Sequence, residues 1–268
     1  MRNSAFHFRI GGAMILLVAI AALFAPWLSP GDPQGIHLED SFLVPSLAHP
    51  LGCDNSGTDI LAILLHGARL SLKVGFLATF LCLSIGLLLG SWAGYRGGRV
   101  DAVIMRLLDV IFAFPGIILA IAIATVMGPS ETNLILALAA TGWAGYTRLV
   151  RGEVRALKEK EYVHAAKALG FSASRIVARH IWPNLVSPLV VAATFGLAGT
   201  ILAEASLSFL GVGVPPGTPS WGSLLNQGKD FLLEAPHIST FPGLAIMFTI
   251  LGFNFLGEGL RERLDPKG

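Results

Sequence analysis

The sequence predicts an all-α, polytopic membrane protein with six transmembrane helices. Only 13% of its 268 residues are charged, and the mean hydropathy is +0.68, which is too apolar for the surface of a soluble protein. Apolar runs long enough to cross a bilayer also alternate with short polar segments along the whole chain. Cys53 lies in a polar loop and Cys82 in an apolar run, so the sequence offers no disulfide framework.

The first apolar run covers residues 10–28. It is long enough for one span, and it ends at Pro26 and Trp27, a pair that suits an interfacial anchor. A cleaved signal peptide is the alternative, because small residues within 21–25 resemble a cleavage site. The length of the run and its terminal tryptophan favour an uncleaved first span.

Five further apolar runs are expected to span the membrane. The third span is interrupted by Pro115 and Gly116, so its freed backbone groups must be satisfied by neighbouring helices or by water in a cavity. The fourth span is the weakest by hydropathy and is expected to face protein rather than lipid. These runs lie at about residues 70–94, 103–127, 133–150, 185–210 and 241–260.

The small residues of the second span predict close helix contact. They are Gly75, Ser84, Gly86, Gly90 and Gly94.

The basic residues predict the orientation of the spans. With six spans, the N-terminal head, the turn at 95–102, the segment 148–184 and the C-terminal tail share one side, and most of the 19 Lys and Arg residues lie there. The positive-inside rule makes that side cytoplasmic. Both termini are therefore expected inside the cell, with the loops 29–69 and 211–239 outside.

The longest hydrophilic stretch is residues 155–184, here called the polar segment. Residues 155–169 are almost all strong helix formers, Gly170 suits the position just past a helix end, and Ser172 can cap a second helix. Pro183 is expected to end or kink that second helix. Such a segment can simply connect two spans, or it can carry a function of its own.

The spacing Ala165-Ala166-x3-Gly170-x12-Pro183 resembles the EAA loop of the integral-membrane subunits of ATP-binding-cassette importers. That loop reads Glu-Ala-Ala-x3-Gly with a proline thirteen residues further on, and it forms the coupling helix that docks in a cleft of the ATPase subunit. His164 stands where the glutamate is usual. The resemblance implies that contact with the ATPase falls to His164, Ala165, Ala166, Gly170, Phe171, Ser172, Arg175 and Pro183.

Three further stretches resemble the dipeptide, oligopeptide and nickel branch of the same family. Residues 49–59 are similar to HPLGTDxxGRD, with Cys53 and Thr58 in place of a threonine and an arginine. Residues 94–115 resemble AGYxGGxVDxxIMRxxDxxxAxP, and residues 253–266 resemble FNLLGDGLRDxLDP. The four motifs follow one another in the order of the family.

The resemblance implies a type I importer permease fold in a prokaryotic cytoplasmic (inner) membrane. Residues 1–67 would form the first span and an extracytoplasmic loop, residues 68–260 the permease core, and residues 261–268 a cytoplasmic tail. It also implies a heterodimer with a second, homologous permease, two ATP-binding subunits on the cytoplasmic face, and an extracytoplasmic substrate-binding protein. Di- and oligopeptides are the expected substrates, and nickel or a metal chelate is the alternative.

No pattern in the sequence points to catalysis, to a metal site or to nucleic-acid binding. A Gly-x4-Gly-Lys-Ser/Thr motif is absent, so ATP and Mg are expected on partner subunits, and this chain is expected to bind no cofactor and to be no enzyme. The histidines lack metal-ligand spacing, and His49 with Cys53 makes a poor metal site. A stand-alone secondary transporter is disfavoured, because neither an inverted repeat nor a pair of intramembrane charges stands out.

Two acidic residues, Glu204 and Asp109, lie within expected spans, where a charge has an insertion penalty of about 2.5 to 3.5 kcal/mol. Glu204 is expected either to contact a cationic or zwitterionic substrate in the pathway or to pair with a hydroxyl on a neighbouring helix. Pro115 is the second candidate for the pathway. Asp109 is three residues from Arg106, which predicts a local ion pair.

Overall fold

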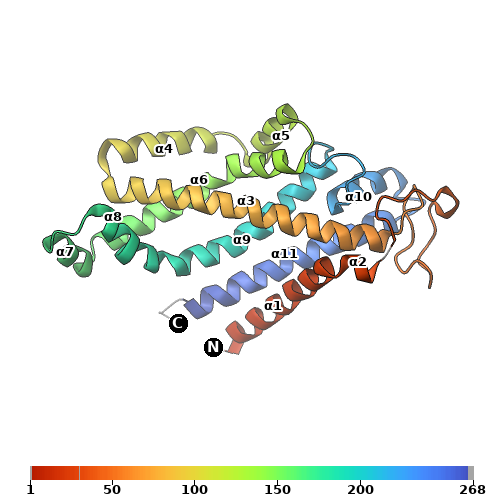
Figure 1. Cartoon of the computed structure of the whole chain (residues 1–268), viewed down its shortest axis with the longest axis horizontal. Helices are drawn as coiled ribbons and strands as arrows, with labels where there is room; N and C mark the ends of the chain where they lie inside the picture. The colour runs from red at the N-terminus through yellow and green to blue at the C-terminus, as the bar shows by residue number, and fades with distance from the viewer. Residues whose placement is uncertain (1, 30, 265–268) are drawn as a thin grey trace.

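The apolar runs fold into long helices that lie side by side along the longest axis of the molecule (Figure 1). The structure is a computed structural model that describes residues 2–29 and 31–264. In that part of the chain the only pairing of β type is an isolated bridge between Cys53 and Asp59, so the all-α prediction is confirmed. The long helices are α1 (Arg2–Leu23), α3 (Ile60–Arg96), α6 (Glu131–Lys158), α9 (Trp182–Phe209) and α11 (His237–Leu264).

Four helical segments are long and apolar enough to cross a membrane: residues 5–23, 60–96, 173–209 and 237–264. A fifth candidate arises if α4 (Gly98–Phe112) and α5 (Gly116–Met127) together form one broken span. Helix α6 is not among the candidates, in keeping with the weak hydropathy expected of the fourth span. The described residues thus show four or five candidate spans.

The break between α4 and α5 bends the chain by 85°. Pro115 stands at the N-terminal cap of α5 and has no N–H to continue a helical ladder from α4. The amides of Ile118 and Leu119 instead begin a new ladder on the carbonyl of Pro115. The interruption predicted at this proline is therefore a sharp change of direction, which is visible between α4 and α5 in Figure 1.

Helices α3 and α6 pack through glycines. A Cβ atom built on Gly90 would lie 2.7 Å from the carbonyl oxygen of Thr147, and one built on Gly94 would lie 2.9 Å from the carbonyl oxygen of Arg151. Real Cβ atoms do not approach so closely, so only glycine allows these backbones to meet. This confirms the contact predicted from the small residues of the second span.

Helix α1 packs along α11 in a similar way. A Cβ atom on Gly252 would lie 2.9 Å from Cδ1 of Ile15, and one on Gly259 would lie 2.5 Å from the backbone nitrogen of Phe8. Val18 and Ala22 are buried in the same core as Phe253. The first helix thus packs as a part of the bundle.

The two ends of the bundle differ. The polar end carries α7 (Glu161–Ala168) and α8 (Ala173–Ile176), and α1 begins and α11 ends toward this end (Figure 1). The opposite end, here called the loop end, carries α2 (Ala25–Leu28), the 3-10 turns η1 (Leu38–Asp40) and η3 (Lys229–Phe231), and α10 (Trp221–Gly228).

Trp221 fixes α10 to the bundle: its indole N–H donates to the carbonyl oxygen of Leu64 at 3.0 Å, and its side chain is 2% exposed. The expected domain boundaries after residues 67 and 260 both fall within helices, because α3 begins at Ile60 and α11 continues to Leu264. Residues 265–268 of the expected tail lie outside the described residues.

Candidate functional site

Instead of the two predicted helices, the polar segment contains the end of α6, the short helices α7 and α8, a π-helical turn and the start of α9. Helix α6 runs on to Lys158, and the chain then turns at Glu159 and Lys160 before α7 begins at Glu161. The single helix predicted over residues 155–169 is therefore wrong. Burial accounts for the break, because the turn lets Val163 and Ala166 pack into the core, and tertiary packing of this kind overrides helix propensity.

Gly170 ends α7 in a Schellman motif. The amide of Phe171 donates to the carbonyl of Ala166 at 3.1 Å, and the amide of Gly170 donates to the carbonyl of Lys167 at 2.9 Å. Gly170 has a φ of +78°, a conformation that side chains disfavour. The spacing of Ala166 and Gly170 in the motif thus has a direct structural cause, and the predicted role of Gly170 just past a helix end is confirmed.

The second half of the polar segment continues into α9 without a stop. A π-helical turn covers Val177–Ile181, and Pro183, which has no N–H to donate, follows it as the second residue of α9. The helix therefore does not end at Pro183. Ser172 occupies the cap position of α8, but its hydroxyl makes no capping bond and lies 3.3 Å from that of Ser174.

One side of the polar segment is anchored in the bundle. The indole N–H of Trp182 donates to the hydroxyl of Ser91 on α3 at 3.0 Å. The apolar side chains beneath the segment come from α6, α7, α8, the π-helical turn and α9. They are Val150, Val154, Val163, Ala166, Ile176, Ile181 and Leu185.

The other side of the polar segment is exposed and partly apolar. Leu169 is 74% exposed and Tyr162 is 41% exposed, although both lie in the most hydrophilic part of the chain. His164 and Ala165 are exposed beside them, and Nε2 of His164 lies 3.7 Å from a carboxylate oxygen of Glu159. An exposed pair of this kind contributes little to stability, so His164 is free to contact another molecule.

Phe171 and Arg175 cover the hinge between α7 and α8. The Arg175 guanidinium lies 5.4 Å from the centroid of the Phe171 ring. The His180 ring stacks on the same Phe171 ring, with 6.1 Å between the two ring centroids. These three side chains pack together just after the turn at Gly170. The site residues predicted from the motif thus divide into those that shape the turn and those that are presented outward.

Glu204 is buried inside the bundle and is 0% exposed. Its carboxylate accepts hydrogen bonds from the hydroxyls of Ser71 on α3 at 2.7 Å and of Ser208 on α9 at 3.0 Å. Of the two roles expected for Glu204, the pairing with a hydroxyl on a neighbouring helix is present. The contact with substrate stays a prediction, which this geometry does not favour.

Asp109 pairs with Arg148 on α6, so the local pair expected with Arg106 is wrong. Nη2 of Arg148 lies 3.5 Å from Oδ1 of Asp109, and the guanidinium also lies 4.1 Å from the centroid of the Phe112 ring. The partner is far away in the sequence, and no periodicity within one span could indicate it. Pro115, the other pathway candidate, is exposed at the bend that follows.

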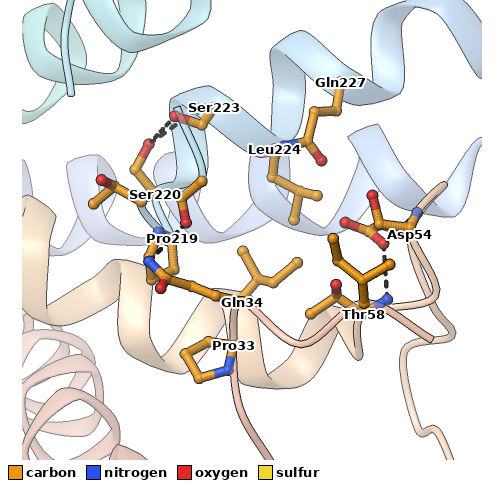
Figure 2. A pocket seen from close by; sticks show the side chains of 14 residues that line it. Pro33, Gln34, Asp54, Thr58, Pro219, Ser220, Ser223, Leu224 and Gln227 are labelled. Carbon is orange, nitrogen blue, oxygen red and sulfur yellow. Dashed lines mark hydrogen bonds between the residues drawn. The ribbon is translucent and has the colours of Figure 1, made fainter. Parts of the chain in front are cut away.

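At the loop end, a cavity of about 150 Å³ lies between residues 33–58 and residues 217–227 (Figure 2). The side-chain amide of Gln34 donates to the carbonyl of Gly217 at 2.9 Å, and the hydroxyl of Thr58 donates to the carbonyl of Gly35 at 2.6 Å. Asp54 is buried here and accepts from the amides of Ser56 and Thr58. Burial raises the pKa of Asp54, and the two amide bonds oppose that shift.

His49 and Cys53 do not share a ligand position. Nδ1 of His49 lies 3.0 Å from Oδ2 of Asp59, and the carbonyl of Cys53 lies 3.2 Å from Nε2 of His237. Among the described residues no group of three metal-ligating side chains comes together. The motif at residues 49–59 instead packs the loop end against the start of α11.

The fold is similar to that of a solved chain of an ABC transporter. Two solved inward-facing crystal forms of the MetNI methionine ABC transporter align with TM-scores of 0.61 and 0.62, and each alignment covers 76% of this chain and 96% of that chain. The sequence identities are 20% and 19%, so this likeness concerns the fold alone.

Residues 86–267 match the family described as "Binding-protein-dependent transport system inner membrane component". A putative peptide transport system permease protein of Brucella suis biovar 1 (strain 1330) is 43% identical over 97% of this chain and 88% of its own length. The glutathione transport system permease protein GsiD of Escherichia coli O6:K15:H31 (strain 536 / UPEC) is 44% identical over 94% of this chain and 84% of its own length. The chain therefore belongs to this family of inner membrane components.

Membership has direct consequences. The chain is a multi-pass inner membrane permease of a bacterial ABC transporter and a non-catalytic subunit. ATP is bound by partner subunits of the system, and a binding protein is a further partner.

Proposed function

We propose that this chain forms, together with a second homologous permease, the translocation pathway for di- or oligopeptides, driven by ATP hydrolysis on two separate subunits. The relatives that are 43% and 44% identical to this chain are named for the transport of peptides and of glutathione, which is itself a small peptide. Nickel or metal-chelate uptake by the same architecture is the alternative.

The proposed topology has six spans with both termini in the cytoplasm. Helix α6 is the span that apolar length alone does not identify. Its contact with α3 through Gly90 and Gly94 supports the assignment, because a helix covered by protein does not need a lipid-compatible surface. The polar end would then be cytoplasmic, which agrees with its many basic residues.

The polar segment is proposed to couple this subunit to an ATPase. The observation that carries this proposal is the contrast between its two sides. Val163 and Ala166 tie α7 to the core, whereas Leu169 remains 74% exposed at the turn. The small, exposed Ala165 on the same helix adds little bulk, which suits close docking of α7 into a cleft of another protein.

The anchored side explains how a force on the segment could reach the membrane. The segment is continuous with α6 at one end and with α9 at the other, and Trp182 links it to α3. A displacement of α7 would therefore move three helices together. Alternating access follows if those helices turn about the pathway between inward-open and outward-open states.

The proposed contact residues take different parts. Gly170 and Ala166 would set the turn, and Phe171 with Arg175 would hold its shape. Ser172 and Pro183 would place α8 and the start of α9. His164 and Ala165 would touch the ATPase directly.

Reconstitution tests the proposal. The chain is purified with its second permease, its ATPases and its binding protein, and is placed in sealed vesicles. Uptake of a labelled dipeptide that requires ATP on the side of the polar end is expected. Uptake of a nickel chelate without uptake of peptide would favour the alternative, and uptake without any ATPase would refute the proposal.

A further inference from the structure

The cavity at the loop end lies between two segments of this chain that are joined by their own hydrogen bonds (Figure 2). Its walls are residues 33–58 and residues 217–227, and the amide of Gln34 ties one wall to the carbonyl of Gly217 in the other. Asp54 and Ser220 in these walls are 3% and 0% exposed. At about 150 Å³ the cavity is smaller than most small-molecule sites, which measure about 300–1,000 Å³. Its size therefore fits one side-chain end better than a whole solute.

The cavity offers acceptors that the chain itself does not satisfy. Oε1 of Gln227 is buried and has no hydrogen-bond partner among the described residues. The carboxylate of Asp54 accepts two backbone amides, but none of the ion pairs between described residues includes it. Buried acceptors and buried charges are normally paired, because leaving them unpaired costs free energy. A positively charged donor that enters the cavity would satisfy these groups.

The loop around the cavity is acidic. Residues 29–68 contain five acidic residues and neither lysine nor arginine. The acidic residues are Asp32, Glu39, Asp40, Asp54 and Asp59. Negative charge on this loop attracts a positively charged partner and disfavours an acidic one. The charge of the loop and the acceptors inside the cavity thus select the same kind of ligand.

Exposed apolar side chains at the same place favour a protein as the partner. Ile36 lines the cavity but is 70% exposed, and Leu38 and Leu47 of the same loop are exposed as well. A free hydrated cation would leave these side chains in water, whereas a protein surface would cover them. The family is described as binding-protein-dependent, so a binding protein is the partner that this surface fits.

We propose that the cavity receives a lysine or arginine side chain of the binding protein, whose charged end pairs with Asp54 and donates a hydrogen bond to Gln227. This inference rests on the proposed topology, which puts the loop end outside the cell. Lysine and arginine carry donors and no acceptor, so they match a cavity that offers acceptors. Charge-assisted hydrogen bonds of this kind are stronger than neutral ones. Ile36 and the neighbouring apolar side chains pack against the binding protein around this contact.

The affinity of the binding protein for the assembled complex in lipid nanodiscs tests the contact. Asp54→Asn removes the charge but can still accept the amides of Ser56 and Thr58, so the turn is kept. The variant is expected to weaken binding about tenfold, as loss of a buried charge pair does. Glu39→Gln removes a charge from an exposed position of the same loop and is the matched control, with an expected change of less than about twofold. Equal affinities of the two variants at unchanged thermal unfolding midpoints would overturn the inference.

Two variants at Gln227 test the sign of the charge without altering Asp54. Gln227→Lys supplies the cavity with an ammonium group from the chain itself and is expected to weaken binding about tenfold. Gln227→Glu adds a second carboxylate and is expected to bind at least as tightly as the unsubstituted complex. Equal weakening by both variants would overturn the contact, because it would show that shape and not charge decides the binding.

The remaining outcomes separate this inference from its alternatives. Unchanged affinity of Asp54→Asn, together with loss of a thermal stabilisation by ammonium ions that the unsubstituted complex shows, would overturn the inference in favour of a free cation. Affinity is measured without transport. Unsubstituted complexes that bind the binding protein but take up no peptide with ATP would therefore refute the proposed function and leave this contact standing.

Discussion

The hydroxyl of Ser71 donates a 2.7 Å hydrogen bond to the carboxylate of Glu204, and this bond joins α3 to α9 in the interior of the bundle. Ser208 donates a second bond to the same carboxylate. A buried carboxylate with two donors and no exposed surface is a structural link between helices. The pathway is therefore expected elsewhere on the chain.

Glu204→Gln is expected to preserve peptide uptake to within about twofold. Its amide keeps the size of the carboxylate and can still accept from Ser71, so stability should fall by only about 1–2 kcal/mol. Glu204→Ala leaves both serines without their acceptor and should lower the unfolding midpoint much further. Two measurements check this: peptide uptake by complexes that are shown to be folded, and the thermal unfolding midpoint of the same complexes. Loss of uptake in Glu204→Gln at an unchanged midpoint would show that the carboxylate contacts substrate.

Gly170→Trp is expected to release the ATPase subunits from the membrane complex. The substitution puts a bulky side chain on the exposed turn and strains a backbone with a φ of +78°. Gly170→Asn is the matched control, because asparagine tolerates this conformation and adds little bulk. Co-purification of the ATPases measures the effect. Equal retention of ATPases by both variants would argue against docking at this turn.

Gly90→Ala is expected to destabilise the contact between α3 and α6. The added methyl group would lie 2.7 Å from the carbonyl of Thr147, and overpacking of this kind costs typically about 1–3 kcal/mol. Gly145→Ala, on α6, is the control, since its Cβ atom would meet nothing within 4 Å. The unfolding midpoints of the two variants should differ by several degrees. Similar midpoints would contradict the packing of these two helices.

Cys53 is expected to resist alkylation in the native protein. Burial raises the pKa of its thiol to about 11, with further contributions from Asp59, Asp40 and Asp54. The reactive thiolate is then on the order of a hundredfold scarcer near neutral pH than in an ordinary cysteine. As the pH rises toward the pKa, the thiolate population grows about tenfold for each pH unit.

The matched control is Ser46→Cys, at an exposed position of the same loop, in a chain that lacks Cys53. Rates of reaction with a maleimide over pH 7 to 9 check the expectation. Rapid labelling of Cys53 at pH 7 would show that the turn at residues 49–59 is open.

The positions of the helices followed from the sequence because hydrophobic length and glycine spacing are local signals. Gly90 and Gly94 indicated close contact before any partner was known, and the structure supplied α6 as that partner. Pro115 likewise marked the break between α4 and α5, although its 85° bend could not be predicted.

The errors share a different origin, which is contact between distant residues. The break at Glu159 depends on burial of Val163 and Ala166 against other helices, which overrides strong helix propensity. The pairing of Asp109 with Arg148 is not predictable for the same reason, because nothing within α4 indicates a side chain on α6. A stand-alone secondary transporter is now excluded by family membership.

Cross-linking from the exposed turn tests the proposed coupling most directly. Leu169→Cys, in the chain without Cys53 and Cys82, is combined with a short bifunctional reagent in sealed cells and in inverted vesicles. A cross-link to an ATPase subunit, with labelling by an impermeant reagent only in inverted vesicles, is the expected result. Labelling of Leu169→Cys from outside intact cells, or an assembled complex that yields no cross-link to an ATPase, would contradict the account.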